Sequence, residues 1–129
     1  MIVGIGTDIV EIARIADALT RHGAAFAERV LGADEWVEYQ RRCTSNAKVG
    51  IAYLAKRFAG KEAFAKAFGT GIAGVVSWHR LQILNDKNGR PQLFFNGELA
   101  QEMQQRGWQA QISLTDEKKY AQAFVIIEQ

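Results

Sequence analysis

The feature that most constrains the fold is the segment at residues 57–71, which reads RFAGKEAFAKAFGTG. Its Ala, Phe, Lys and Glu content favours a helix, and Phe58, Glu62 and Lys66 follow one another at four-residue intervals. Residues four apart lie on one face of a helix. Charged groups inside an otherwise apolar helix must be paired or must bind a ligand. The segment therefore predicts a long central helix, over residues 51–68, that carries polar chemistry.

Two more basic residues lie on a flank of this helix, because Arg57 and Lys61 are also four residues apart. The segment ends in Gly-Thr-Gly at residues 69–71, and Gly69 suits the left-handed cap that ends many helices. Backbone N–H groups in such a turn can approach a phosphate, so Gly71 is a candidate for ligand binding.

The N-terminal segment, MIVGIGTDIVE, predicts a buried strand over residues 2–10 with one bare, glycine-lined surface. Asp8 is the only charge within that strand, and a buried carboxylate is costly unless it meets a cation. Asp8 and Glu62 are therefore candidates to share one hard divalent ion, for which Mg²⁺ is suited by its oxygen ligands. Two plainer readings stay open. Asp8 can cap a following helix, and Glu62 can form an ordinary helix pair with Lys66, worth about 0.2–0.5 kcal/mol.

Composition limits the class of protein. The 129 residues suit one domain, 1–129, and 48% hydrophobic with 23% charged residues is typical of a globular protein. Sixteen basic against 14 acidic residues argue against a nucleic-acid binder recognised by bulk charge. No apolar run approaches a membrane span of about 18 residues. The single Cys43 excludes an internal disulfide, so a cytoplasmic location is expected. Neither histidine has a second ligand at zinc spacing.

The remaining pattern predicts an α+β domain with a largely antiparallel sheet around the central helix. Further helices are expected at residues 11–21, 25–30, 35–42 and 98–106, and strands at 78–84, 92–95, 108–115 and 120–128. Asp34 is the expected N-cap of the helix at 35–42, and the polar stretch 43–49 is expected to connect it to the central helix. Asn88-Gly89 indicates a hairpin turn. In the last strand, the face with Phe124 and Ile126 suits an interface.

Two motifs together resemble a known family. GIGTDIVEIARI at residues 4–15, paired with RFAGKEAFAKAFGTGI at 57–72, is similar to the holo-acyl-carrier-protein synthases, the short bacterial type of 4′-phosphopantetheinyl transferase. The likeness extends to residues 120–128 and so covers nearly the whole chain. It implies transfer of phosphopantetheine from coenzyme A to a serine of apo-acyl carrier protein in fatty-acid biosynthesis, with Mg²⁺ and release of 3′,5′-ADP. It also implies a homotrimer with the coenzyme A cleft between neighbouring subunits.

The resemblance assigns catalytic roles to three residues. Asp8 and Glu62 would be the Mg²⁺ ligands, and Lys66 would lie beside the reacting phosphate. Cations on the phosphoryl oxygens and close positioning are what such a transfer needs. The proton of the serine has two candidate acceptors, which are Glu62 and a metal-bound water held by Asp8.

Other positions match substrate contacts of the family. Arg57 and Lys61 match residues that contact coenzyme A phosphates, and the alternative is that both are solvated helix charges. Arg90 and Pro91 lie in a Gly-basic-Pro turn like one near the nucleotide, although that turn can also be a plain hairpin.

Two arginines are candidates for partner binding. Arg14 and Arg21 would form the basic surface that meets an acidic carrier-protein helix, and the alternative is that they are ordinary surface arginines.

One stretch departs from the family pattern. Residues 113–116 read SLTD, with Asp116 where many members carry a histidine that can contact the 3′-phosphate. An aspartate would repel that phosphate, so either another basic residue serves or Asp116 turns away. Thr115 can still contribute its hydroxyl.

Other functions remain open. The carrier can belong to a polyketide or other secondary pathway. The chain can also be a catalytically silent coenzyme A or carrier-protein binding module, which predicts binding without transfer. A purely structural trimer-forming protein would leave the charges of residues 57–66 unexplained.

Overall fold

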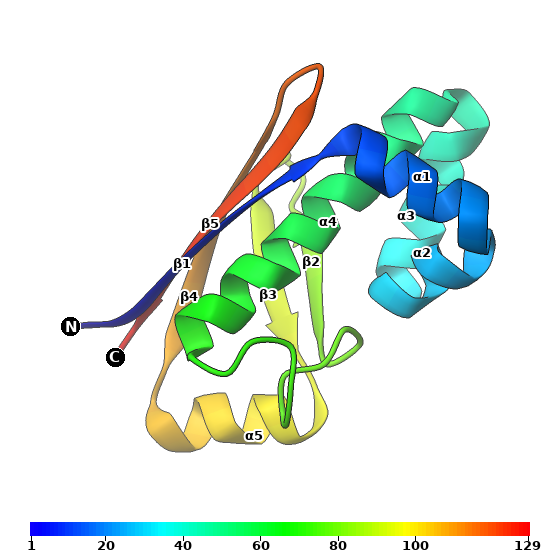
Figure 1. Ribbon diagram of the computed structural model, residues 1–129. Coiled ribbons are helices and arrows are strands. Elements are labelled where there is room, and N and C mark those ends of the chain that lie inside the picture. Colours follow the sequence, from blue (N-terminus) through cyan, green and yellow to red (C-terminus); the bar gives the residue numbers. More distant parts are fainter.

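Helix α4 (Ala47–Phe68) runs through the middle of the molecule, and the other elements pack around it (Figure 1). The computed structural model describes all residues, 1–129. The helix begins four residues earlier than predicted because Asn46 caps it, with Oδ1 accepting from the Lys48 N–H at 2.8 Å. It ends as predicted at Gly69, whose φ of 103° is left-handed.

The antiparallel α+β architecture predicted from the sequence is confirmed. A three-stranded sheet has the order β1-β5-β4, and β2 and β3 form a separate hairpin. The sheet lies along one side of α4, and the three short helices α1–α3 gather near the start of α4 (Figure 1). The elements other than α4 are, in order, β1 (Ile2–Glu11), α1 (Ile12–His22), α2 (Ala24–Val30), α3 (Ala33–Ser45), β2 (Leu81–Asn85), β3 (Pro91–Phe95), α5 (Gly97–Arg106), β4 (Gln109–Asp116) and β5 (Tyr120–Glu128).

Strand β1 packs on α4 through its glycines. A Cβ atom on Gly6 would lie 1.9 Å from the carbonyl oxygen of Ala63, and one on Gly4 would lie 2.1 Å from that of Ala67. The bare surface predicted for this strand therefore faces α4, and the two backbones meet directly. This close approach fixes where Asp8, two residues after Gly6, meets the helix.

The prediction that β1 is buried is wrong for its other face. Ile5 and Ile9 are 63% and 60% exposed, because α4 covers only the glycine side of the sheet. On β5, Phe124 is 43% exposed and Ile126 is half-buried on the same side. Ile5 pairs with Ile126 across the two strands. We call Ile5, Ile9, Phe124 and Ile126 the apolar sheet face.

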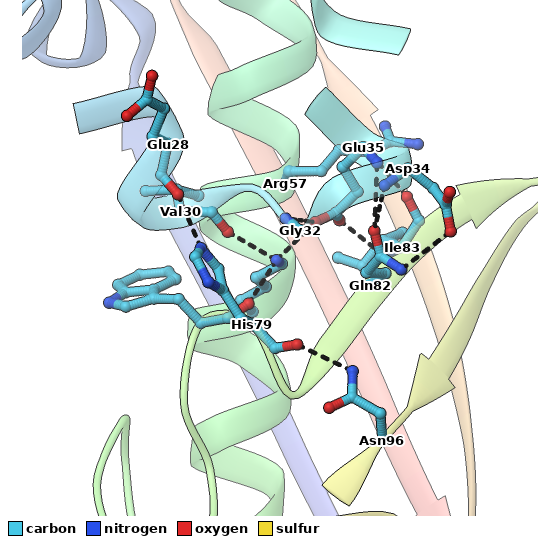
Figure 2. Close-up of polar contacts among 12 residues, drawn as sticks. Glu28, Val30, Gly32, Asp34, Glu35, Arg57, His79, Gln82, Ile83 and Asn96 are labelled. Carbon is cyan, nitrogen blue, oxygen red and sulfur yellow. Dashed lines mark hydrogen bonds and ion pairs between the residues drawn. The ribbon is translucent and has the colours of Figure 1, made fainter. Parts of the chain in front are cut away.

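Helix α3 begins differently from the prediction. Its N-cap is Gly32, so the expected cap at Asp34 is wrong. Gln82 on β2 supplies the cap instead, since its Oε1 accepts from the N–H groups of Asp34 at 2.9 Å and Glu35 at 3.2 Å (Figure 2). The cap thus comes from a residue almost fifty positions away, which local sequence does not reveal.

Two other boundaries moved. The polar stretch 43–49 is mostly helical, and the single residue Asn46 separates α3 from α4. The strand expected from residue 78 starts at Leu81, because the Arg80 N–H bonds to the Ser77 carbonyl in a turn. No helix is both long enough and apolar enough to pass through a lipid bilayer.

Candidate active site

Asp8 and Lys66 meet where β1 crosses α4. The Lys66 ammonium donates to Asp8 Oδ1 at 3.0 Å and to the Thr7 carbonyl at 3.0 Å. The Asp8 side chain is 17% exposed, so it reaches the surface only partly. Asp8 does not cap the next helix, since Glu11 is the N-cap of α1 and no side chain caps it. The plain capping role considered for Asp8 is therefore wrong.

Glu62 lies half-buried on α4 beside this pair, and its side chain makes no hydrogen bond or ion pair. Lys66, its possible helix partner, is engaged by Asp8 instead. Burial raises the pKa of the Glu62 carboxyl, the negative charge of Asp8 raises this pKa further, and Lys66 opposes both. Lys66 pairs with Asp8 alone, so the negative charge of Glu62 is left without a paired cation.

This donor set fits a magnesium ion. Glu62 has carboxylate oxygens without a donor, and the neighbouring Asp8 charge makes a cation favourable. No third His, Cys, Asp or Glu side chain joins them as a ligand. Mg²⁺ commonly takes one or two carboxylates and completes its shell with water and substrate phosphates. Asp8 and Glu62 are the residues that would hold it.

The two carboxylates open onto a cleft of about 570 Å³ between α1, α2 and α4. Arg14 and Arg21 line the same cleft from exposed positions on α1, so the structure brings the predicted partner-binding residues next to the predicted catalytic ones. Neither arginine has an ion-pair partner. Their charges remain available to an acidic ligand.

Sequence reasoning missed the apolar wall of this cleft. Phe26 and Phe58 line it, with ring centroids 6.2 Å apart, and Phe58 stacks on Trp78 at 5.3 Å. The signal for Phe58 was present, because it precedes Glu62 by four residues on the same helix face. No comparable signal marked Phe26, which reaches the cleft from another helix.

Lys61 does not face the cleft, and the predicted phosphate contact is wrong. Its side chain is 0% exposed and forms a 2.7 Å ion pair with Glu35, which is also 0% exposed. It also donates to the carbonyls of Val30 and Trp78, so all three N–H groups are used. Burial lowers the pKa of the lysine, and Glu35 opposes that shift.

Arg57 is also buried, so it is not a solvated helix charge. It donates to the Ile83 carbonyl at 3.1 Å and to Asn85 Oδ1 at 3.0 Å, and it lies 4.0 Å from the centre of the Tyr53 ring. Burial lowers the pKa of its guanidinium. It lines a separate cleft of about 410 Å³ with Lys87, beside the β2–β3 turn. A phosphate contact there stays a prediction.

The other predicted coenzyme A residues lie outside the Asp8–Glu62 cleft. Arg90 and Pro91 follow the β2–β3 turn, where Gly89 has a φ of 83°, and line a groove between β3 and β4. Thr115 is exposed near the end of β4. Gly71 donates its N–H to the Ala65 carbonyl. Contrary to the prediction, this N–H is therefore not free to bind a phosphate.

Asp116 is paired rather than free. The Lys56 ammonium on α4 lies 3.1 Å from Asp116 Oδ1. A basic residue therefore accompanies the aspartate that replaces the family histidine, and its charge is partly neutralised.

Comparisons with known proteins agree on one family. The family model for the 4′-phosphopantetheinyl transferase superfamily matches residues 4–125. The chain is 54% identical to the holo-[acyl-carrier-protein] synthase of Herminiimonas arsenicoxydans, over 99% of this chain and 98% of that protein. The crystal structure of a synthase of that name from Neisseria meningitidis superposes with a TM-score of 0.92, at 42% identity and 100% coverage of both chains. A Bacillus anthracis synthase in complex with CoA (3′,5′-ADP) gives 0.81 at 34% identity, over 99% of this chain and 97% of that one.

Proposed function

The chain belongs to the 4′-phosphopantetheinyl transferase superfamily, and we propose that it acts as a holo-[acyl-carrier-protein] synthase. It transfers 4′-phosphopantetheine from coenzyme A to a serine of apo-acyl carrier protein and releases 3′,5′-ADP. The observation that carries this proposal is that Asp8 and Glu62 line one cleft, while Lys66 forms an ion pair with Asp8. A carboxylate pair with an adjacent ammonium suits phosphoryl transfer, which depends on positioning and on stabilising charge.

Asp8 and Glu62 would hold the Mg²⁺ ion. When bound, the ion supplies positive charge to the pyrophosphate oxygens of coenzyme A. Lys66 keeps Asp8 in place through its 3.0 Å contact and adds a second positive charge beside Asp8.

The bond changes follow from these positions. The serine oxygen forms a bond to the β-phosphorus of coenzyme A, and the bond from that phosphorus to the oxygen of 3′,5′-ADP breaks. Of the two carboxylates proposed to hold the metal, Glu62 is the one without a hydrogen-bond donor, so we assign the serine proton to it.

The carrier protein would dock on α1 and α2. Arg14 and Arg21 offer unpaired positive charge to an acidic partner, and Phe26 and Phe58 offer an apolar wall beside it. Charge steers the approach and the apolar wall supplies contact area.

Coenzyme A would need a second copy of the chain. Arg57, Arg90, Pro91 and Thr115 are its proposed contacts, yet none of them lines the Asp8–Glu62 cleft. A homotrimer that brings the β2–β3 turn of one subunit to the cleft of its neighbour would unite the two sets. The apolar sheet face supplies a surface for such an assembly.

The test is intact-mass spectrometry of apo-acyl carrier protein incubated with this protein, coenzyme A and Mg²⁺. A mass gain of one phosphopantetheine that EDTA abolishes is the expected result. No gain with a folded sample would contradict the activity for that carrier. Calorimetric titration with coenzyme A would then show whether the chain is a binding module.

A further inference from the structure

A polar cluster is enclosed where α2, α3 and α4 meet, and the steps described above do not use it. Lys61 and Glu35 form its centre, an ion pair of 2.7 Å with both side chains 0% exposed. The ammonium also donates to the Val30 carbonyl at 2.6 Å and to the Trp78 carbonyl at 2.7 Å. Each of the lysine N–H groups therefore has an acceptor.

The glutamate is equally well bonded. Glu35 Oε1 also accepts from the Gly32 N–H at 2.8 Å, and Oε2 accepts from the Ile83 N–H at 2.7 Å. In Figure 2 the Glu35 carboxylate lies between Gly32 and Ile83, with contacts to both sides. We call Val30, Gly32, Glu35, Lys61, Trp78 and Ile83 the buried polar cluster.

Such a pair is a poor way to gain stability alone. Apolar residues of the same volume often stabilise a core as well as a buried ion pair does, because desolvating two charges offsets their attraction. Hydrogen bonds, however, are restricted in length and direction. The cluster therefore fixes the relative placement of segments distant in the sequence, namely the end of α2, the start of α3, α4 and residues 78–83.

Two of these segments form the wall of the cleft. Val30 is the last residue of α2, the helix that carries Phe26. Trp78 stacks on Phe58, and Phe58 contacts Phe26. Lys61 directly precedes Glu62 on α4. The cluster thus holds the α2 wall against the turn of α4 that carries the carboxylate.

We propose that the Lys61–Glu35 pair is a positioning device for the transfer reaction. It sets the separation between the α2 wall and Glu62, and so sets where the serine of the docked carrier protein lies. The pair touches no substrate and acts through Phe26, Phe58 and Glu62. This inference rests on the proposed function.

The test uses a double variant, Lys61→Met with Glu35→Gln. It removes both charges together, so no lone buried charge remains, and the glutamine still accepts from a backbone N–H. We expect a folded protein by circular dichroism. A displacement of about 1 Å in the wall can cost up to ~10²-fold in rate, so the KM for the carrier should rise about tenfold and kcat should fall. The KM for coenzyme A should stay within about twofold of the wild-type value.

Two further variants separate positioning from stability. Glu35→Asp keeps the charge but is one methylene shorter, so it cannot bond to Lys61, Gly32 and Ile83 at the same time. We expect a smaller rise in the carrier KM and a smaller fall in kcat than in the double variant. Leu99→Ala removes a buried side chain of α5 outside the cleft, so it lowers stability while leaving the carrier KM unchanged.

The outcomes are distinct. A folded double variant or Glu35→Asp variant with wild-type carrier KM and kcat would overturn the inference. So would an equal rise in carrier KM in Leu99→Ala. Failure of both cluster variants to fold would count against it too, because the pair would then be needed for folding itself. If the wild type shows no transfer, the proposed function fails instead. Fluorescence anisotropy of a labelled apo-carrier, measured without Mg²⁺ or coenzyme A, separately shows whether the carrier still binds to the cleft wall.

Discussion

The surroundings of Glu62 disfavour its charged form in the absence of a ligand. The carboxylate is half-buried next to Asp8, and the one nearby ammonium bonds to Asp8. Burial and the Asp8 charge both raise the pKa of Glu62, so the ionised form destabilises the metal-free fold. A bound cation would relieve this cost.

Replacing Glu62 by Gln should separate activity from stability. We expect transfer to fall by about 10²-fold or more, because a metal ligand and proton acceptor is lost. Without metal at pH 7, the thermal midpoint should equal or exceed that of the wild type. Lowering the pH through the raised pKa of Glu62 stabilises the wild type, since the folded state takes the proton first, so the difference should shrink. Circular dichroism melts at pH 7 and pH 4.5 check this.

Glu117→Gln is the matched control, because Glu117 is exposed in the β4–β5 turn. It should change neither quantity. Wild-type turnover in Glu62→Gln would remove Glu62 from the site, and a clearly lower midpoint would contradict the electrostatic argument.

At the scale of elements, the contact of β1 with α4 decides the geometry of the site. The glycine side of β1 lets the strand lie directly on the helix, so Asp8 reaches Lys66. The same closeness leaves no room for a side chain. In helix α3, Arg41 and Arg42 both donate hydrogen bonds to Glu38.

Gly6→Ala should move Asp8 away from its partners. The new Cβ would lie 1.9 Å from the Ala63 carbonyl oxygen, which is backbone, so β1 must shift. We expect a stability loss of about 1–3 kcal/mol from overpacking. Activity should fall by ~10²-fold, with a raised Mg²⁺ requirement. Urea unfolding and Mg²⁺ titration of the rate measure the two effects.

Gly4→Ala is the matched variant, with a similar clash at 2.1 Å from Ala67 but farther from Asp8. It should lose similar stability and less activity. Equal activity losses in the two variants would assign the effect to stability alone.

Glu38 on α3 should make a small, pH-dependent contribution to stability. Hydrogen bonds from Arg41 and Arg42 lower the pKa of its carboxyl to about 2. Because the Glu38 side chain is 31% exposed and Arg41 is 70% exposed, solvent screens the pair, and Glu38→Gln should cost less than about 1 kcal/mol at pH 7. A depressed pKa stabilises the fold above the unfolded value of 4.5. The difference between the proteins should therefore vanish as the pH falls from 4.5 toward 2. Urea unfolding at pH 7, 4 and 2 checks this, and a difference that grows in acid would contradict it.

At the scale of the whole molecule, two surfaces are suited to binding other chains. On the apolar sheet face, Ile5 and Ile9 are 63% and 60% exposed, which favours burial against another chain. The face of α1 with Arg14 and Arg21 is charged and suits a transient binding partner.

Phe124→Lys tests the first surface. Placing a charge on the apolar sheet face should prevent assembly, because a buried unpaired ammonium is costly. We expect sedimentation velocity to show a trimer for the wild type and a folded monomer for the variant, with transfer lost. A monomeric, active wild type would refute the proposed assembly.

Arg14→Glu tests the second surface. Reversing one charge in the cleft should weaken docking of an acidic carrier and raise its KM by about tenfold at low salt. The KM for coenzyme A should barely change, and the effect should diminish at high ionic strength. Steady-state kinetics with each substrate varied will show this. An unchanged carrier KM would place the docking surface elsewhere.

The sequence by itself determined the fold class and the central helix, and it marked Asp8 and Glu62 as candidates for one site. These follow from local signals, since the helical period, the cap at Gly69 and the lone charge in a strand are all legible within a few residues. The interface between β1 and α4 could also be predicted in part, because the glycines at positions 4 and 6 indicated a bare surface on the strand.

The tertiary structure alone decided which charges face inward. Lys61 and Glu62 are adjacent in sequence, yet one is sealed in the core with Glu35 and the other lies at the cleft. Helical period assigns residues to faces but does not say what covers each face. Partners such as Glu35 for Lys61, or Gln82 for the start of α3, come from distant segments that meet only when the chain packs. For the same reason, the exposed face of β1 could be known only once α4 was seen to cover a single side of the sheet.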